Sequence, residues 1–125
     1  MLARPSALAE TIIGSAVEVH RALGPGLFES VYDACLAVEL SARGIAFHRQ
    51  VPVPVRYRTV ILHLGYRADF VIADSILVEL KTVERLIPLH RAQVMTYLKL
   101  LGLRQGLIFN FNSERLIDGM RNVLL

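Results

Sequence analysis

The stretch that decides the fold is Arg67-Ala68-Asp69-Phe70-Val71-Ile72-Ala73-Asp74-Ser75-Ile76-Leu77-Val78-Glu79-Leu80-Lys81. Two apolar runs flank the turn-like segment 73–75, and this pattern predicts a β-hairpin. Both runs are apolar at nearly every position, as in strands that are covered on both faces. Three charged residues nevertheless lie inside them, Asp69, Glu79 and Lys81. Because burying an unpaired carboxylate costs several kcal/mol, these charges mark the place where a function is to be sought.

The register of this hairpin decides whether the charges meet. If segment 73–75 forms the whole loop, Asp69 lies opposite Glu79, and Arg67 lies opposite Lys81. Glu79 and Lys81 are two positions apart and share a face of the sheet. A loop one residue shorter would place the two acids on opposite faces. The prediction therefore needs a loop of odd length, and it then brings two carboxylates and an amine together.

Such a cluster of side chains suits a divalent metal ion. Mg²⁺ prefers hard oxygen ligands, usually one or two carboxylates together with waters and phosphate oxygens. The ion neutralises phosphoryl charge, and a lysine beside it can position the attacking water or stabilise the transition state. The alternative is a structural ion pair, Glu79 with Lys81 or Asp69 with Arg67. The spacing alone leaves both interpretations open.

Composition narrows the class of protein. At 125 residues, with 54% hydrophobic and 20% charged residues, the sequence predicts one globular domain spanning residues 1–125. A net charge of +3 permits a polyanionic partner. The single cysteine, Cys35, excludes an internal disulfide framework and a Cys-rich zinc site. Charged residues interrupt the apolar N-terminal stretch, so we expect neither a signal peptide nor a membrane span, and a cytoplasmic location.

Periodicity and chain breakers predict the remaining elements. Helices are predicted over three ranges: 6–23, 28–43 and 89–101. Outside the hairpin, strands are predicted over 51–57, 60–64 and 107–111, with prolines that suggest an edge position for the first. The tail after residue 111 stays ambiguous. This order predicts an α/β (α+β-like) fold with a mixed four- to five-stranded sheet flanked by helices. The third helix makes a right-handed crossover between parallel strands.

Two polar residues on the predicted helices are further candidates. Glu29 lies in a first helical turn, where it complements the helix dipole. In the alternative interpretation, Glu29 and Tyr32, one turn apart, point toward the charged cluster. Gln93 and Tyr97 also share a helical face. They are either a solvated polar pair or, in the sharper interpretation, Gln93 reaches a substrate phosphate or the water shell of a metal.

Taken in order, these residues resemble the PD-(D/E)XK nuclease superfamily and, more closely, the GxxExxY protein family within it. The naming motif of that family is matched by Gly26-Leu27-Phe28-Glu29-Ser30-Val31-Tyr32. Three more segments are also similar: Gln50 to Tyr57, Ala92 to Leu98 and Gly106 to Phe111. The resemblance covers residues 13–123 and implies a restriction-endonuclease-like core. Ala68 stands where the superfamily name has proline, a position that the chemistry does not need.

The resemblance also implies a role for each candidate. Asp69 and Glu79 would be metal ligands, with the Leu80 backbone carbonyl as a third ligand. Lys81 would be the catalytic lysine. Glu29 would be an auxiliary acid and a further metal ligand, and Gln93 the polar residue of the second core helix.

The sequence therefore predicts a Mg²⁺- or Mn²⁺-dependent nuclease that hydrolyses phosphodiester bonds in nucleic acid, with DNA as the favoured substrate. The rival prediction is a non-catalytic module that retains the nuclease fold and binds nucleic acid or a protein. A third is a dimeric scaffold with a vestigial site. A chain this short has little room for a separate recognition element, so a homodimer or a partner protein would supply specificity.

Overall fold

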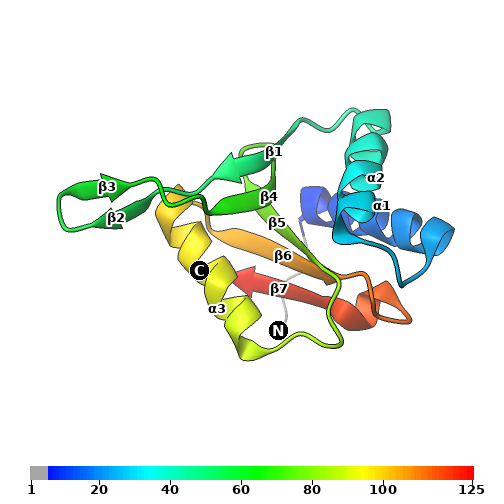
Figure 1. The fold of residues 1–125 in the computed structure, drawn as a ribbon. Coiled ribbons are helices and arrows are strands. Elements are labelled where there is room, and N and C mark those ends of the chain that lie inside the picture. Colours follow the sequence, from blue (N-terminus) through cyan, green and yellow to red (C-terminus); the bar gives the residue numbers. More distant parts are fainter. Residues whose placement is uncertain (1–5) are drawn as a thin grey trace, which may run out of the picture.

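Helices cover both faces of a central β-sheet (Figure 1). The structure, a computed structural model, describes residues 6–125. In chain order, its elements are α1 (Ala7–Leu23), α2 (Glu29–Ala42), β1 (Phe47–Pro52), β2 (Val55–Tyr57), β3 (Val60–Leu62), β4 (Arg67–Ile72), β5 (Ile76–Lys81), α3 (Pro88–Leu101), β6 (Gln105–Asn110), the 3₁₀ turn η1 (Leu116–Gly119) and β7 (Met120–Leu124). The three predicted helices are confirmed, and their ends lie within about one residue of the predicted ones, the usual uncertainty of helix boundaries.

The predicted hairpin is formed by β4 and β5. These strands pair antiparallel, with Phe70 opposite Val78 and Ile72 opposite Ile76. This register confirms the loop of odd length over residues 73–75. Nearly every side chain of β5 is buried, because helices lie over both faces of the sheet.

The main sheet has five strands in the order β1-β4-β5-β6-β7. β5 and β6 are parallel, and α3 makes the crossover between them. The other neighbours in this sheet are antiparallel. The mixed sheet of four to five strands is therefore confirmed. The ambiguous tail proves to supply η1 and the edge strand β7.

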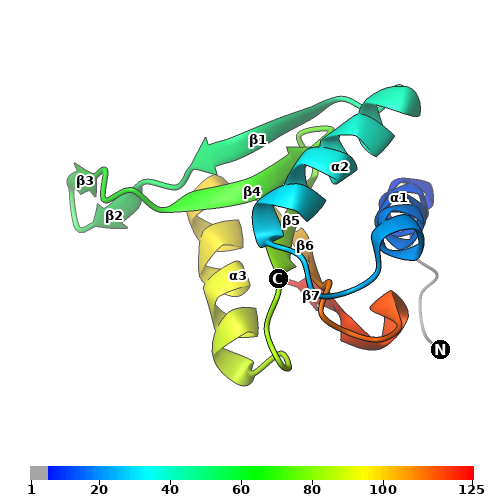
Figure 2. The same ribbon diagram turned by 45° about the vertical axis from the view of Figure 1, so that its right-hand side comes forward.

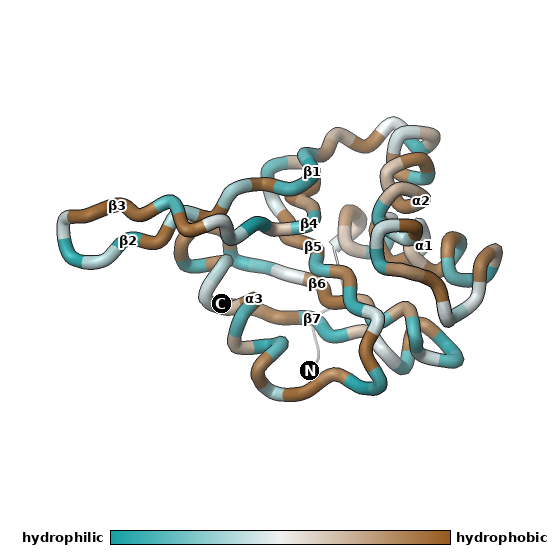
Figure 3. Tube along the Cα trace, viewed as in Figure 1, coloured by the Kyte–Doolittle hydropathy of each residue, from teal (hydrophilic) through white to brown (hydrophobic). Residues whose placement is uncertain are grey.

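The segment predicted as one strand over residues 51–57 is divided in the structure. β1 ends at Pro52, and β2 begins at Val55. Proline cannot donate to a strand ladder, and Pro52 and Pro54 lie at this break. β2 pairs only with β3 in a separate two-stranded sheet, which projects from the main body as an arm (Figures 1 and 2). We call residues 55–62 the β2–β3 arm; its β3 strand is strongly hydrophobic (Figure 3).

The sheet separates two hydrophobic clusters. The cluster beneath α1 and α2 contains buried residues such as Ile12, Leu36, Phe70 and Phe109. The cluster beneath α3 contains others, including Leu77, Val94, Leu98 and Ile108. Figure 2 shows α3 on the side of the sheet away from α1. Because strand side chains alternate between faces, residues of β4 and β5 on the side of Leu77 are directed toward α3.

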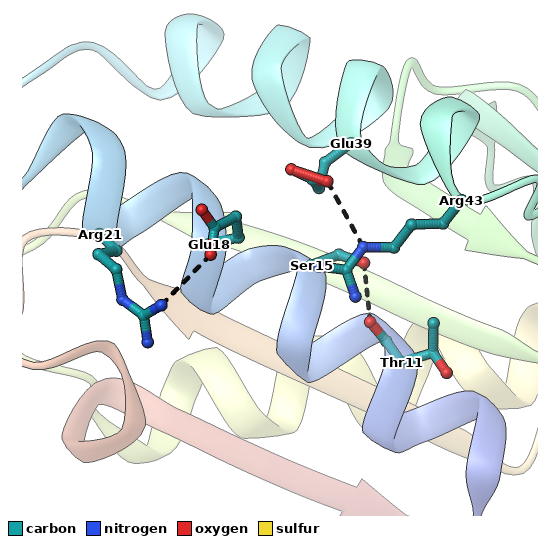
Figure 4. Close-up of polar contacts among 6 residues, drawn as sticks. All are labelled: Thr11, Ser15, Glu18, Arg21, Glu39 and Arg43. Carbon is teal, nitrogen blue, oxygen red and sulfur yellow. Dashed lines mark hydrogen bonds and ion pairs between the residues drawn. The ribbon is translucent and has the colours of Figure 1, made fainter.

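Figure 4 shows polar contacts within α1 and near the end of α2. Ser15 Oγ donates to the Thr11 carbonyl within α1 (2.7 Å). Arg43 Nε donates to Glu39 near the end of α2 (3.4 Å), in an ion pair worth about 1 kcal/mol or less. A Cβ atom at Gly14 of α1 would lie 3.4 Å from Arg43 Nη1, so glycine leaves room for this arginine. None of the helices within residues 6–125 combines the length and apolar character that a bilayer span requires.

Candidate active site

The ladder between β4 and β5 stops before it reaches the predicted acids. Its last pair is Phe70 and Val78. Beyond that pair, side chains replace the backbone contacts: the Asp69 N–H donates to Glu79 Oε1 (3.0 Å), and the Leu80 N–H donates to Asp69 Oδ2 (2.8 Å). Each carboxylate therefore accepts a hydrogen bond from a backbone N–H of the opposite strand. These two hydrogen bonds fix both acids at the point where the strands separate.

The predicted convergence of Asp69, Glu79 and Lys81 is present. Asp69 follows the alternation of Val71, and Glu79 and Lys81 follow that of Leu77, so all three belong to the α3 side of the sheet. Within residues 6–125, none of the three forms an ion pair at 4.0 Å or less. The structural ion-pair interpretation is therefore wrong for this structure.

The predicted pairing of Arg67 with Lys81 is also wrong. The strands diverge beyond Phe70, so the β4–β5 ladder does not extend to these residues. Arg67 instead lies opposite Pro52 of β1, and its Nη1 donates to the Gln50 carbonyl (3.3 Å). The positive charge that lowers the pKa of both Asp69 and Glu79 is that of Lys81, although it forms no ion pair with either within residues 6–125.

Burial and mutual repulsion perturb the acids. Glu79 is only 5% exposed. Its pKa is raised to about 8, chiefly by burial and then by the negative charge of Asp69, against the opposing charge of Lys81. Burial likewise raises the pKa of Asp69, while the hydrogen bond from the Leu80 N–H opposes that rise. In the absence of a further cation, the pair therefore retains a proton near neutral pH.

Glu29 is brought to the same acids. As the first residue of α2, it borders a cavity of about 390 Å³ whose lining also includes Asp69 and Gln50. Desolvation raises the pKa of Glu29, and the charge of Asp69 raises it further. Glu29 and Asp69 therefore face the same cavity.

Tyr32 does not join this cluster. Its side chain is fully buried, and its ring stacks on Phe111 at 4.4 Å. Its hydroxyl donates to the Gly24 carbonyl (2.6 Å) and accepts from the Leu27 N–H (3.1 Å). Of the two candidate residues of α2, Glu29 borders the cavity that Asp69 also lines, whereas Tyr32 fixes the loop before α2.

Lys81 is held from two directions. Its Nζ donates to Gln93 Oε1 (3.3 Å), and Gln93 Nε2 in turn donates to the Tyr97 hydroxyl (3.3 Å). Tyr97 is buried, so Gln93 is not merely part of a solvated pair. The Lys81 carbonyl accepts from the Phe111 N–H (2.8 Å), which anchors the end of β5 to the chain after β6. Gln93 therefore orients the lysine, and its reach toward a phosphate stays a prediction.

Three polar groups around the site were not predicted as functional. Gln50 lies opposite Asp69 in β1, with a left-handed φ of 51°, and its amide donates to Asp33 (3.3 Å). Asp33 also accepts from Arg49. Asn110, 2% exposed, accepts from the Val83 N–H (3.1 Å) and donates to its carbonyl (2.9 Å). A polar residue inside the apolar run 107–111 was the available signal for Asn110; no comparable signal marks Gln50.

The donor set fits a hard divalent cation. Each of Asp69 and Glu79 spends one oxygen on a backbone N–H, which leaves its second oxygen for another partner. Within residues 6–125, no three His, Cys, Asp or Glu side chains gather as a ready metal-binding group. Mg²⁺ commonly uses only one or two carboxylates and takes its other ligands from water and substrate. A buried Glu79 and a half-buried Asp69, neither in an ion pair within residues 6–125, match that requirement.

Comparison with known proteins gives one match. A family model described as the PD-(D/E)XK nuclease superfamily matches residues 6–123. No curated protein and no solved structure matches the chain. The mixed sheet with helices on both faces agrees with the restriction-endonuclease-like fold of that superfamily, whose nucleases generally depend on divalent metal ions and act on nucleic acid.

Proposed function

Because the chain belongs to the PD-(D/E)XK nuclease superfamily, we propose that it is a Mg²⁺- or Mn²⁺-dependent nuclease with DNA as its substrate. One observation carries the proposal: the buried carboxylate of Glu79, the half-buried carboxylate of Asp69 and a lysine meet where β4 and β5 separate, and within residues 6–125 no ion pair neutralises the acids. A structural cluster would be expected to neutralise its charges internally. A cluster that leaves its acids without a cation is suited to receive one.

Four groups would hold the metal: the carboxylates of Asp69 and Glu79, the Leu80 backbone carbonyl and the carboxylate of Glu29. When bound, a divalent ion neutralises charge on the phosphoryl group and makes water a stronger acid. The raised pKa of Glu79, about 8, supports this assignment, because the protein alone leaves its negative charge poorly compensated.

Lys81 would act on the reacting atoms. Its ammonium group has three N–H donors, and one is occupied by Gln93 Oε1. The remaining donors are available to orient the attacking water and to stabilise charge on the phosphoryl oxygens as the bond from phosphorus to the water oxygen forms and one ester bond breaks. Gln93, fixed by Tyr97, keeps the lysine in that orientation.

We also assign the chain to the GxxExxY proteins on the segment Gly26 to Tyr32. Each motif residue has its own physical task in this structure. Gly26 adopts a φ of 100°, which favours glycine. Glu29 borders the acidic cavity. The Tyr32 hydroxyl hydrogen-bonds to the loop that contains Gly26 and leads to Glu29, and these bonds fix its position.

The test is cleavage of plasmid DNA, single-stranded DNA and RNA with Mg²⁺, with Mn²⁺ and with EDTA. We expect cleavage with either metal and none with EDTA. Glu79→Gln and Lys81→Ala should each reduce the rate by at least about 100-fold, the lower range for loss of an acid–base group. Glu114→Gln and Lys99→Ala are matched controls on exposed residues and should cleave normally.

A second readout separates metal binding from cleavage. Mn²⁺ should raise the melting temperature of the wild-type protein and not that of Glu79→Gln, since ligands that bind only the folded state stabilise it. Cleavage that survives in both site variants would discredit the assignment. Salt-dependent binding of nucleic acid without cleavage under any metal would instead support the non-catalytic module.

A further inference from the structure

A second cavity lies beside Lys81 and shares no lining residue with the cavity beside Glu29. It has a volume of about 730 Å³, within the usual range of about 300–1,000 Å³ for ligand sites. Its lining includes Lys81 and Gln93 of the candidate site, residues of α3 and, at its far end, Val55 and Arg56 of the β2–β3 arm. We call this cavity the α3 groove. It leads from the proposed reaction centre to the base of the arm.

The two cavities differ in charge. The cavity beside Glu29 is lined by three carboxylates, Glu29, Asp33 and Asp69, against one arginine. The α3 groove is lined by Arg56 and Lys81, and no Asp or Glu is among its lining residues. The cavity beside Glu29 therefore favours a cation, and the α3 groove favours a polyanion.

The walls of the α3 groove are aromatic and aliphatic. Tyr66 is 49% exposed, and its ring meets the buried Tyr97 ring edge-on at 6.3 Å. The Tyr66 carbonyl accepts from the Val53 N–H (2.8 Å), which fixes its backbone. Leu89 on the opposite wall is 70% exposed. Tyr66 thus has a fixed backbone and a half-exposed ring, and it shares the groove with the apolar surface of Leu89.

This combination matches an unpaired strand better than a duplex. The outer surface of a duplex consists of phosphates and sugars, and its bases are stacked inside. Proteins that bind single strands join a cationic groove to aromatic side chains on which bases stack. In the α3 groove, Lys81 and Arg56 supply the positive charge, and Tyr66 supplies the aromatic ring.

We propose that the α3 groove binds an unpaired strand of nucleic acid, with a base against Tyr66 and the backbone phosphates near Lys81 and Arg56. This inference rests on the proposed function and specifies its substrate as single-stranded, either a free strand or the unpaired part of a longer structure. A second copy of the chain is the competing occupant, because its β2–β3 arm exposes Val60 and Ile61 by 52% each. The cationic lining of the groove favours the polyanion.

The experiment measures binding without cleavage. In EDTA, fluorescence anisotropy compares a labelled single-stranded oligonucleotide, its duplex and an abasic version of the strand. We expect the single strand to bind more tightly than the duplex. Tyr66→Ala should weaken single-strand binding by about 5- to 100-fold, from the energy of one base–aromatic stack. Tyr66→Phe should bind within about 3-fold of wild type, because phenylalanine keeps the stacking ring.

Controls make the stacking role specific. Tyr57→Ala removes an exposed tyrosine of the arm that does not line the groove, and it should leave the affinity unchanged. The abasic strand should bind wild type and Tyr66→Ala alike. Arg56→Ala should weaken binding to every strand and lower the salt dependence by about one phosphate contact. Thermal unfolding of each variant confirms that it folds.

Several outcomes overturn the inference. These are tighter binding to duplex than to single strand, equal losses in Tyr66→Ala and Tyr57→Ala, and an equal loss on the abasic strand. Another is a dimer that Tyr66→Ala dissociates while oligonucleotide affinity is unchanged, which would assign the groove to a second copy. Because binding is measured without metal, failure of the nuclease proposal would leave these results intact. Failure of single-strand binding would likewise not abolish metal-dependent cleavage.

Discussion

The two halves of the β4–β5 hairpin are held together in different ways. Next to the turn, three residue pairs form a regular antiparallel ladder, with apolar side chains such as Phe70 buried beneath α1 and α2 and others such as Leu77 buried beneath α3. Beyond Phe70 the ladder ends, and the carboxylates of Asp69 and Glu79 hold the backbone instead. The first half is built from interactions that favour the folded state. The second keeps charges that burial disfavours, as expected where function overrides stability.

Removing the last apolar pair should have the largest effect on folding. Phe70 is fully buried, and its ring lies 5.7 Å from that of Phe47. Phe70→Ala should lower the free energy of unfolding by about 3–5 kcal/mol, because it leaves a cavity between the sheet and the helices. Urea denaturation measures this loss.

The neighbouring acid supplies the matched control. Asp69→Asn retains an oxygen that can accept from the Leu80 N–H and removes a half-buried charge, so its stability should fall by less than about 1 kcal/mol. If Asp69→Asn proves as destabilising as Phe70→Ala, the acids contribute as much to the free energy of unfolding as the apolar pairs do, and the two halves of the hairpin do not differ in this respect.

Glu79→Gln should sharpen the contrast through its dependence on pH. In EDTA, Glu79 has a pKa of about 8 in the folded state against an ordinary value of 4.5. The folded state therefore binds more protons than the unfolded state between these values, and wild-type stability falls as pH rises from 4.5 to 8. Glutamine does not titrate, so the stability of Glu79→Gln does not fall for this reason. Its advantage should be near zero at pH 4 and should grow by up to about 1.4 kcal/mol for each pH unit until the pH exceeds about 8.

Denaturation at a series of pH values measures the difference between the two proteins, so that all other titrating groups cancel. Glu114→Gln changes an exposed carboxylate and should show no such divergence. A constant difference between wild type and Glu79→Gln at all pH values would show that burial and Asp69 do not perturb this acid.

The smallest effect concerns backbone strain in the open half. Gln50 lies beside Asp69 with a φ of 51°, a conformation that costs a residue with a side chain roughly 1 kcal/mol relative to glycine. Gln50→Gly and Gln50→Ala both remove the hydrogen bond to Asp33, so the comparison isolates the backbone. The glycine variant should be about 1 kcal/mol more stable than the alanine variant in urea. Equal stabilities would mean that the backbone relaxes at this position.

Sequence patterns predicted most of the framework. The apolar runs on either side of Ala73-Asp74-Ser75, together with the requirement that Asp69 and Glu79 share a face, led to the correct register. Strand alternation has a period of two, so one choice of loop length decides every facing pair. Helix limits followed from apolar periodicity and from breakers such as Gly24, because these signals are local.

Side-chain partners were predicted less completely. Arg67 did not meet Lys81, and Tyr32 turned into the core, although both had the right spacing to join the cluster. Spacing decides which residues share a face, but it does not decide where two strands separate or which neighbour a hydroxyl binds. The placement of Gln50, Asp33 and Asn110 depended on segments distant in sequence.

The sequence by itself determined that Glu79 and Lys81 share a face of a hairpin, and that Asp69 joins them if the loop has an odd length, because alternation along a strand is a local property of the backbone. Only the tertiary structure decided that the acids would hold the backbone of opposite strands with no ion-pair partner among residues 6–125, and that an acidic cavity would lie beside Asp69 and a cationic, aromatic groove beside Lys81. Those features arise where α2, α3, β1 and the arm approach the hairpin, and such contacts between distant segments have no period in the sequence.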